Sequence, residues 1–331
     1  MKRRSFLASA GALGASACSG GGGGARPGAA APLRFSVLST ETSAAEQVKW
    51  DPFLRDLAQR LGREVKPFFA SGYAPLIEAM RFGQTDAGWF SNQSGLEAVR
   101  RAGGEVFART THPDGVRGYK SIIVAKMGSG ITLERVLKCD RTLDFGMGDA
   151  KSTSGTLAPR AWLFAPRGLD PATCFKTVRS ASHEANLLSV ANGVVAAATN
   201  NTNDLERLKR RKDAAADAVL AKLDILWESE PLPEDPVIRR SNLDAETKRK
   251  LAEVMLAYGG APGAEGAREM KVLTDLNFGR FQPADDRHLL PVRELEAVDG
   301  LQTAKRKGDA AAVAAQEAEL ARIRADRAKP V

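Results

Sequence analysis

Short apolar segments alternate with helix-like segments along most of this chain, and this alternation constrains the fold more than any other feature. Strands are expected at 33–38, 65–70, 86–90 and 106–109, with helices ending near Leu61 and covering 74–82 and 95–102. Strands joined by helical crossovers form parallel sheets that are covered by helices on both faces. The first part of the chain is therefore predicted to be an α/β unit built on a parallel sheet.

A second series of the same kind begins near Tyr119. Strands are expected at 119–125, 142–147, 175–178, 194–199 and 225–228, with helices at 132–137, 155–165, 184–192 and 204–222, and later at 243–258 and from 293 onward. A chain of 331 residues is long enough for two domains. We expect lobe 1 to comprise 33–120 and 230–331, the latter including the C-terminal helices. Lobe 2, at 121–229, is inserted into it, with a cleft between the lobes.

Residues 1–17 have the features of an export signal peptide. A basic start at Lys2, Arg3 and Arg4 precedes an apolar stretch that is too short to span a bilayer. The pair Arg3-Arg4 is similar to a twin-arginine signal, and the general secretory route is the alternative. We therefore expect a periplasmic protein.

Cys18 follows small residues, as in a bacterial lipoprotein box, although Ala15 stands where Leu is usual. We expect Cys18 to carry a lipid anchor as the chain's membrane contact, with the glycine-rich segment 18–32 as a flexible tether. A processed tail is the alternative. Cys139 and Cys174 could pair in an oxidising compartment, but their spacing alone does not decide this.

Charge and motif content exclude several classes of protein. The formal charge falls from +8 to +5 once Lys2, Arg3 and Arg4 leave with the signal peptide. The basic run 207–212 is flanked by acidic residues, as is typical of a solvated helix face, so we expect no nucleic-acid binding. Three histidines without metal-ligand spacing predict no metal site, and we expect no cofactor.

The strongest local signal is the segment 151–155, in which Ser152, Thr153 and Ser154 precede Gly155 after an expected strand. The first turn of a helix offers unpaired N–H groups and the positive end of its dipole, so added hydroxyls favour a tetrahedral oxyanion. The alternative is an ordinary N-cap. A nucleotide P-loop is excluded because Ala150 replaces the glycine before Lys151.

Two further positions are candidates for ligand contact. His183, at an expected helix start, is able to donate to an anion, and its alternative is a solvent-exposed histidine near an N-cap. Asp235 is a loop or helix-start carboxylate, as are Glu41, Asp149 and Glu184, and for all four the alternative is that they match helix dipoles or are solvated.

Ten segments, in order along nearly the whole mature chain, resemble the periplasmic phosphonate-binding component of ABC transporters. They are 37–41, 68–73, 79–82, 87–94, 97–99, 118–119, 148–155, 183–186, 198–202 and 233–236. The resemblance implies a type II periplasmic-binding fold, in which two lobes joined by a hinge close on an organophosphonate. It also implies partners, namely a membrane permease and its ATPase.

The resemblance assigns roles to individual residues. The family's anion site falls on Ser152, Thr153, Ser154, Gly155, Tyr73, Tyr119 and His183. The aminoalkyl end of the family's ligand is held by two carboxylates; Asp235 is one, but the other position is Asn203. An amide supplies no charge, and losing one charge-assisted hydrogen bond costs about 1–3 kcal/mol. Preference for 2-aminoethylphosphonate is thus open, and phosphite, phosphate or another oxyanion is the alternative ligand.

Two other classes of function remain as alternatives. An enzyme on this fold would need a nucleophile–base pair in the cleft, and only His183 is expected near hydroxyls. A ligand sensor in signalling would use the same fold. We expect a binding protein without enzymatic activity.

Overall fold

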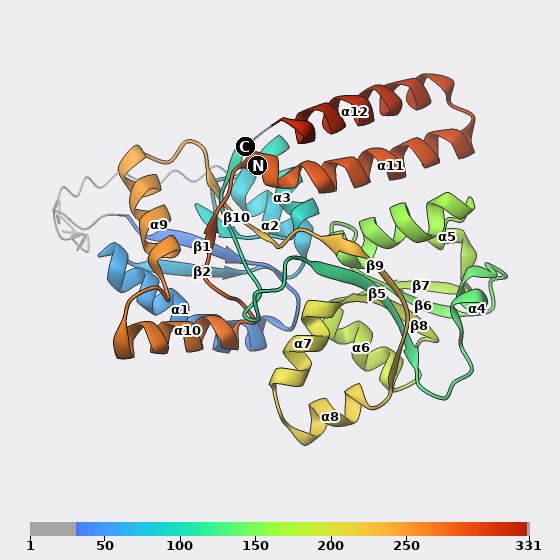
Figure 1. The fold of residues 1–331 in the computed structure, drawn as a ribbon, viewed down its shortest axis with the longest axis horizontal. Coiled ribbons are helices and arrows are strands. Elements are labelled where there is room, and N and C mark those ends of the chain that lie inside the picture. Colours follow the sequence, from blue (N-terminus) through green and yellow to red (C-terminus); the bar gives the residue numbers. More distant parts are fainter. Residues whose placement is uncertain (1–30, 330–331) are drawn as a thin grey trace, which may run out of the picture. The chain divides into compact units, whose positions relative to one another are not determined.

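The chain is organised around two β-sheets (Figure 1). The computed structural model describes residues 31–329, so the predicted signal peptide, Cys18 and most of the tether lie outside the described residues. Within that range, the first sheet has six strands in the order β11-β4-β10-β3-β1-β2 and the second has five in the order β7-β6-β8-β5-β9. We call the first sheet with its helices lobe 1 and the second sheet with its helices lobe 2.

The first sheet is built from segments at both ends of the described chain. Its strands are β1 (Leu33–Val37), β2 (Val65–Phe69), β3 (Ala87–Trp89), β4 (Gly104–Arg109), β10 (Pro236–Arg240) and β11 (Gln282–Pro283). Its helices are α1 (Ser43–Leu61), α2 (Tyr73–Arg81), α3 (Asn92–Arg101), α9 (Ala245–Ala257) and α10 (Gly263–Asp275).

The second sheet comes from the middle of the chain. Its strands are β5 (Tyr119–Lys126), β6 (Asp144–Met147), β7 (Thr177–Ser180), β8 (Ala197–Asn201) and β9 (Leu223–Leu232). Its helices are α4 (Leu133–Leu137), α5 (Pro171–Cys174), α6 (His183–Ala191), α7 (Thr202–Arg210) and α8 (Ala214–Leu220), with π-helical turns at Thr153–Leu157 and Pro159–Phe164.

Both sheets are mixed, so the prediction of parallel sheets is right for some strand pairs and wrong for others. Strand β1 pairs in parallel with β2 and β3, but β10 runs antiparallel to β3 and β4. In the second sheet β5 runs antiparallel to β8 and β9. The reason is the chain path: β10 enters the first sheet on its return from lobe 2, and therefore runs opposite to its neighbours.

The two crossings between the lobes lie side by side. Tyr119 at the start of β5 pairs with Leu232 at the end of β9, and the ladder is irregular between Lys120 and Ile122. At this irregularity the backbone N–H of Ser121 donates to the hydroxyl of Ser229 at 2.9 Å. A bulged pair of antiparallel strands as the connection between lobes is consistent with a hinge.

Helix α1 shows how the sequence builds the core of lobe 1. Thr42 caps the helix by accepting from the N–H of Ala45. Gly62 ends it in the left-handed conformation with φ 63°, at the boundary predicted near Leu61. Its inner face buries Trp50, whose ring contacts Phe53 with centroids 5.8 Å apart. Burial of such aromatic area is a dominant stabilising contribution in a core.

Several helices depart from the predicted pattern, among them the short α5, which was not predicted. The single helix expected at 204–222 is two, α7 and α8, because Lys212 has a positive φ of 50° and Asp213 caps a new start by accepting from the N–H of Ala216 at 2.7 Å. Helix α10 was not predicted, since Gly263 and Gly266 lower the helix propensity of its first turn.

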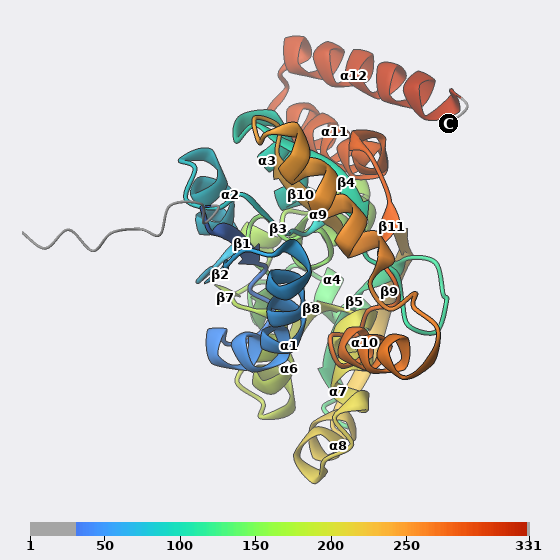
Figure 2. The same ribbon diagram turned by 90° about the vertical axis from the view of Figure 1, so that its left-hand side faces the viewer.

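The C-terminal helices form a hairpin. Helix α11 (Leu290–Lys307) is followed by α12 (Ala310–Ala328), and Figure 2 shows α12 lying beside α11. Leu320 and Ile323 of α12 are buried against Ala297 of α11. None of the helices in residues 31–329 is long and apolar enough to cross a bilayer.

Candidate ligand-binding site

A small cavity of about 30 Å³ lies between the two lobes. Since one water needs about 10–15 Å³ on such a scale, the closed cavity suits a ligand of only a few heavy atoms. Residues of lobe 1 on its wall are Leu38, Thr40, Tyr73, Trp89, Ser91, Thr110, Asp235, Leu276, Asn277 and Phe278. Residues of lobe 2 and the crossing strand are Tyr119, Ser152, Ser154, His183, Asn201, Asn203 and Arg207.

The serine-rich loop reaches the cavity because two glycines allow it to turn sharply. A Cβ on Gly155 would lie 2.8 Å from the Cα of Gly148, closer than real Cβ contacts. The N–H of Gly148 donates to the carbonyl of Gly155 at 3.0 Å, which holds the two backbones together. Ser152 caps the following turn by accepting from the N–H of Gly155 at 3.0 Å, so it is both an N-cap and a wall residue. Ser154 lies on the wall beside it.

Thr153 and Gly155 lie next to the cavity and not on its wall. The hydroxyl of Thr153 is buried and accepts from the N–H of Gln93, in lobe 1, at 2.8 Å. Gly155 packs against Gly148 and His183. Of the predicted site residues these two therefore hold the loop and the lobes together, whereas the others line the cavity.

The two tyrosines enter from lobe 1 and from the crossing strand. Tyr73 begins α2 and is buried, and burial raises the pKa of its hydroxyl well above the ordinary value. Tyr119 donates its hydroxyl to Oδ1 of Asp235 at 3.3 Å, and burial raises its pKa as well. Both tyrosines are therefore neutral hydrogen-bond donors at physiological pH.

Asp235 precedes β10 and is held by lobe 1. The side-chain amide of Asn92 donates to the carbonyl of Pro233 at 2.7 Å and to Oδ1 of Asp235 at 3.3 Å. Burial, followed by the charge of Glu234, raises the pKa of Asp235 well above its ordinary value. A cationic or hydrogen-bond-donating ligand group beside this carboxyl would favour its charged form.

Asn203 lies on the wall near a second, unpredicted carboxyl. Its backbone carbonyl accepts from the side-chain amide of Asn277, in lobe 1, at 3.3 Å. Glu234 is buried next to it, and burial raises the pKa of Glu234 to about 7, an effect that a hydrogen bond from Asn203 opposes. Glu234 is therefore a second carboxyl beside Asn203, although it does not line the cavity.

His183 is the first residue of α6, whose N-cap Ser182 accepts from the N–H of Ala185 at 3.3 Å. The Nε2 atom of His183 lies 3.5 Å from Oγ of Ser152. Burial lowers the pKa of the imidazole to about 3, so the ring is neutral and has one donor and one acceptor nitrogen. The expected solvent-exposed alternative for this histidine is wrong, since the residue is 4% exposed.

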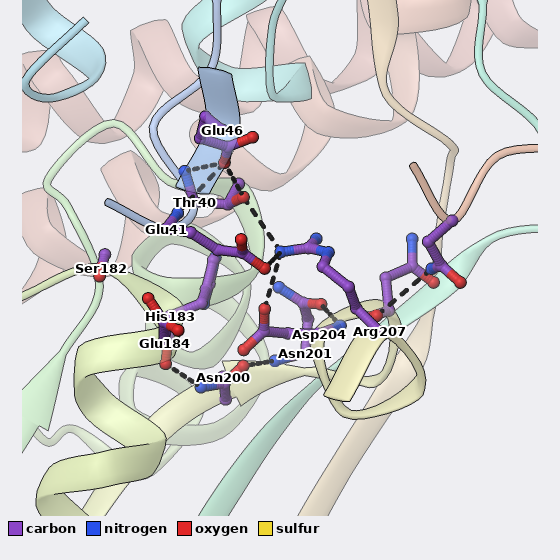
Figure 3. Close-up of polar contacts among 12 residues, drawn as sticks. Thr40, Glu41, Glu46, Ser182, His183, Glu184, Asn200, Asn201, Asp204 and Arg207 are labelled. Carbon is purple, nitrogen blue, oxygen red and sulfur yellow. Dashed lines mark hydrogen bonds and ion pairs between the residues drawn. The ribbon is translucent and has the colours of Figure 1, made fainter. Parts of the chain in front are cut away.

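Arg207 is a wall residue that the sequence analysis missed, and Figure 3 shows its polar contacts. We expected the run 207–212 to be a solvated face, but the Arg207 side chain is only 14% exposed. Its Nη1 donates to Asp204 of the same helix at 2.9 Å and to Thr40 of lobe 1 at 3.1 Å. The signal that could have found it is helical spacing, because Asn203 and Arg207 are four residues apart and share a face of α7.

The disulfide left undecided by spacing is present in lobe 2. Cys139 and Cys174 are joined across a sequence separation of 35 residues. Neither lines the cavity. Within the described part of the chain, no group of three or more His, Cys, Asp or Glu side chains is arranged to hold a metal ion.

Comparison with known proteins agrees with this geometry. The family model for periplasmic substrate-binding proteins of phosphonate ABC transporters matches residues 35–289. A phosphonates-binding periplasmic protein of Escherichia coli strain K12 is 39% identical over 274 residues, which are 82% of this chain and 78% of that protein.

Solved structures extend the likeness to the fold. A binding protein component of an ABC phosphonate transporter from Pseudomonas aeruginosa is 38% identical with a TM-score of 0.84, covering 90% of this chain and 98% of that one. PhnD1 from Prochlorococcus marinus, in complex with methylphosphonate, is 19% identical with a TM-score of 0.68, covering 84% of this chain and 98% of that one. The predicted two-lobed, type II periplasmic-binding fold is confirmed. The chain therefore belongs to the family of periplasmic substrate-binding proteins of phosphonate ABC transporters.

Proposed function

We propose that this protein captures an organophosphonate in the cavity between its lobes and delivers it to a membrane permease and its ATPase. One observation carries the proposal: hydroxyls from Ser152, Ser154, Tyr73 and Tyr119 converge with a neutral His183 on one small interlobe cavity. Neutral donors that are fixed by burial suit a tetrahedral oxyanion because they pay no cost of ionisation or reorganisation.

Each of the predicted site residues has a role in this proposal. Ser152, Ser154 and His183 donate to the phosphonate oxygens from lobe 2, and Tyr73 does so from lobe 1. Tyr119 and Asp235 face the organic end, with Asn203 beside them. Thr153 and Gly155 act indirectly, by fixing the loop through their contacts with Gln93 and Gly148.

Other oxyanions form the second candidate class of ligand. Asn203 supports it, because an amide at this position lacks the charge that would select an aminoalkyl group. Phosphite and phosphate would use the same hydroxyls without needing the organic end of the site.

We infer that the protein performs no chemistry on its ligand. The Nε2 of His183 lies 3.5 Å from the Oγ of Ser152, but burial lowers the pKa of His183 to about 3, which makes its imidazole a weak base. Ser152 Oγ is already engaged as the acceptor for the Gly155 N–H. Incubation of the protein with methylphosphonate or 2-aminoethylphosphonate should therefore release no phosphate.

A ligand screen tests the proposed function. We would measure the thermal shift of the purified protein with 2-aminoethylphosphonate, methylphosphonate, ethylphosphonate, phosphite, phosphate and sulfate. A ligand at 100 times its Kd adds about 2.7 kcal/mol of stability, which such a screen detects. Shifts with phosphonates alone support the proposal, and shifts with inorganic anions alone favour the second class.

The family is periplasmic, and we propose how this chain is held there. Export by a twin-arginine or secretory signal at 1–17 would leave Cys18 as a lipid anchor and 18–32 as a tether. The lobe boundaries at 33–120, 121–229 and 230–331 likewise remain our proposal. Mass spectrometry of the protein from a membrane fraction would detect an acylated N-terminal cysteine, and an unmodified soluble form would contradict the anchor.

A further inference from the structure

Arg207 belongs to lobe 2 but contacts both lobes through a single nitrogen atom. Its Nη1 donates to Oδ1 of Asp204 at 2.9 Å, within α7, and to Oγ1 of Thr40 at 3.1 Å, in the loop after β1. The same nitrogen reaches Oε1 of Glu41 at 3.4 Å. Figure 3 shows the guanidinium group between these partners. Asp204 lies on the same helix as Arg207, whereas Thr40 and Glu41 belong to the other lobe, so separation of the lobes would break only the contacts with Thr40 and Glu41.

Hydrogen bonds within lobe 1 hold Thr40 and Glu41, the lobe 1 partners of Arg207, in place. Oε1 of Glu46 accepts from the hydroxyl of Thr40 at 2.7 Å, and from the N–H groups of Thr40 and Glu41 at 3.2 Å each. Lys49 also pairs with Glu41. The acceptors for Arg207 are therefore preorganised by α1, which lowers the entropic cost of forming the contact on closure.

The same arginine stands on the wall of the ligand cavity. Among the described residues that line this cavity, it is the one Lys or Arg. A guanidinium group has five N–H donors in a rigid fork, and the hydrogen bonds of Arg207 among residues 31–329 all run through Nη1. Its other N–H groups make no hydrogen bond within the described residues, and Arg207 lines both this cavity and a second pocket that contains Lys49 and Arg211.

We infer that Arg207 is a further ligand-recognition residue that couples anion binding to closure of the lobes. Its charge attracts the phosphonate, and its Nη1 fastens the loop at Thr40 and Glu41 over the bound anion. The contacts of Nη1 with Thr40 and Glu41 form only when the two lobes are together, so a ligand that is held between Arg207 and lobe 1 favours closure over opening. This inference rests on the proposed function, because it assigns a residue to the same site.

The test compares two arginines of the same helix. Arg210 also crosses between the lobes, donating to Oδ1 of Asn277 at 2.9 Å and pairing with Asp114 at 2.8 Å, but it does not line the ligand cavity. We expect Arg207→Gln to weaken methylphosphonate affinity at least about 30-fold by calorimetry, since one partner of a buried charge network is removed. Arg210→Gln should weaken it by less than about threefold, as for a partly exposed pair.

Two more measurements separate the effect of Arg207 on lobe closure from the effect of its charge on affinity. Small-angle scattering with saturating methylphosphonate should show a smaller compaction for Arg207→Gln than for the wild type or Arg210→Gln. Arg207→Lys keeps the charge without the fork, and should recover part of the affinity. If Arg207→Gln does not fold because Asp204 loses its partner, the double variant with Asp204→Asn removes both charges and is used in its place.

The outcomes discriminate between the two proposals. If the wild type binds methylphosphonate and the Arg207→Gln variant has the same affinity and the same compaction as the wild type, this inference is overturned and the proposed function stays intact. A loss in Arg210→Gln as large as that in Arg207→Gln would overturn the role of the cavity charge, because interlobe pairing alone would then explain the effect. A wild-type protein that binds no phosphonate would overturn both proposals.

Discussion

The backbone N–H of Tyr73 donates to the carboxylate of Asp149 at 3.1 Å, although the two residues belong to different lobes. Tyr73 is the first residue of α2, whose N-cap Gly72 has no side chain to offer. A Cβ at Gly72 would lie 3.3 Å from Oδ2 of Asp149, so the missing side chain also makes room for that carboxylate. A carboxylate of lobe 2 thus caps a helix of lobe 1.

We predict that Asp149→Ala weakens phosphonate affinity about three- to thirty-fold, because an N-cap contributes about 0.5–2 kcal/mol and this one exists only in the closed protein. Calorimetry on methylphosphonate measures the effect. The matched control is Asp244→Ala, which removes the cap of α9 within lobe 1. The control should lower the melting temperature without changing phosphonate affinity. Equal affinities for the wild type and Asp149→Ala would show that the cap from Asp149 contributes nothing to binding.

We predict that Ser154→Ala weakens phosphonate binding at least about tenfold, since a hydrogen bond to a charged group contributes about 1.5–3 kcal/mol. Tyr73→Ala should have an effect at least as large. The exposed Ser129→Ala serves as the control in the same lobe. Unchanged Kd values for both cavity variants, with intact melting curves, would remove these residues from the site.

The raised pKa of Glu234 predicts that the free energy of unfolding depends on pH. Burial raises its pKa to about 7 from 4.5, so the folded protein holds a proton that the unfolded chain loses. The stability from this group is complete below about pH 4.5 and declines as the pH rises towards 7. Glu234→Gln cannot ionise, and should exceed the wild type by on the order of 2–3 kcal/mol at about pH 8.

Urea denaturation of the ligand-free protein at about pH 8 and about pH 4.5 measures this difference, which should vanish at the lower value. The exposed Glu230→Gln, in β9, is the control and should show little difference at either pH. If Glu234→Gln raises the free energy of unfolding equally at both pH values, the substitution acts through packing and not through loss of an ionisable group.

Replacing Cys139 and Cys174 together by serine should cost about 3–4 kcal/mol of unfolding free energy, because a loop of 35 residues is no longer closed in the unfolded chain. Phosphonate affinity should stay within about twofold, since neither residue lines the cavity. Denaturation and calorimetry on the same samples test both statements. A large loss of affinity at unchanged stability would place the disulfide in the control of closure.

The parts of the fold that follow local rules were predictable from the sequence. The end of α1 at Gly62 and the start of β2 at Val65 follow from turn chemistry and strand pattern. The segment at Ser152 and Ser154 carries a helix-start signal that is readable locally. These features need no knowledge of distant residues.

Features that depend on contacts between distant segments were not predictable. Arg207 is largely covered because Thr40 and Glu41, more than a hundred residues earlier in the chain, accept hydrogen bonds from it. The break between α7 and α8 depends on a positive φ at Lys212, which propensity does not foresee for a lysine. Thr153 carries the same local signal as its neighbours, and only the contact with Gln93 turns it away from the wall.

The measurement that tests the central claim most directly is calorimetric titration of the purified protein with methylphosphonate, 2-aminoethylphosphonate, phosphate and sulfate. Our account predicts one site per chain that binds at least one phosphonate about 100-fold or more tightly than sulfate, a difference of about 2.7 kcal/mol. Binding of inorganic anions as tight as that of both phosphonates, or no binding of either phosphonate, would contradict it.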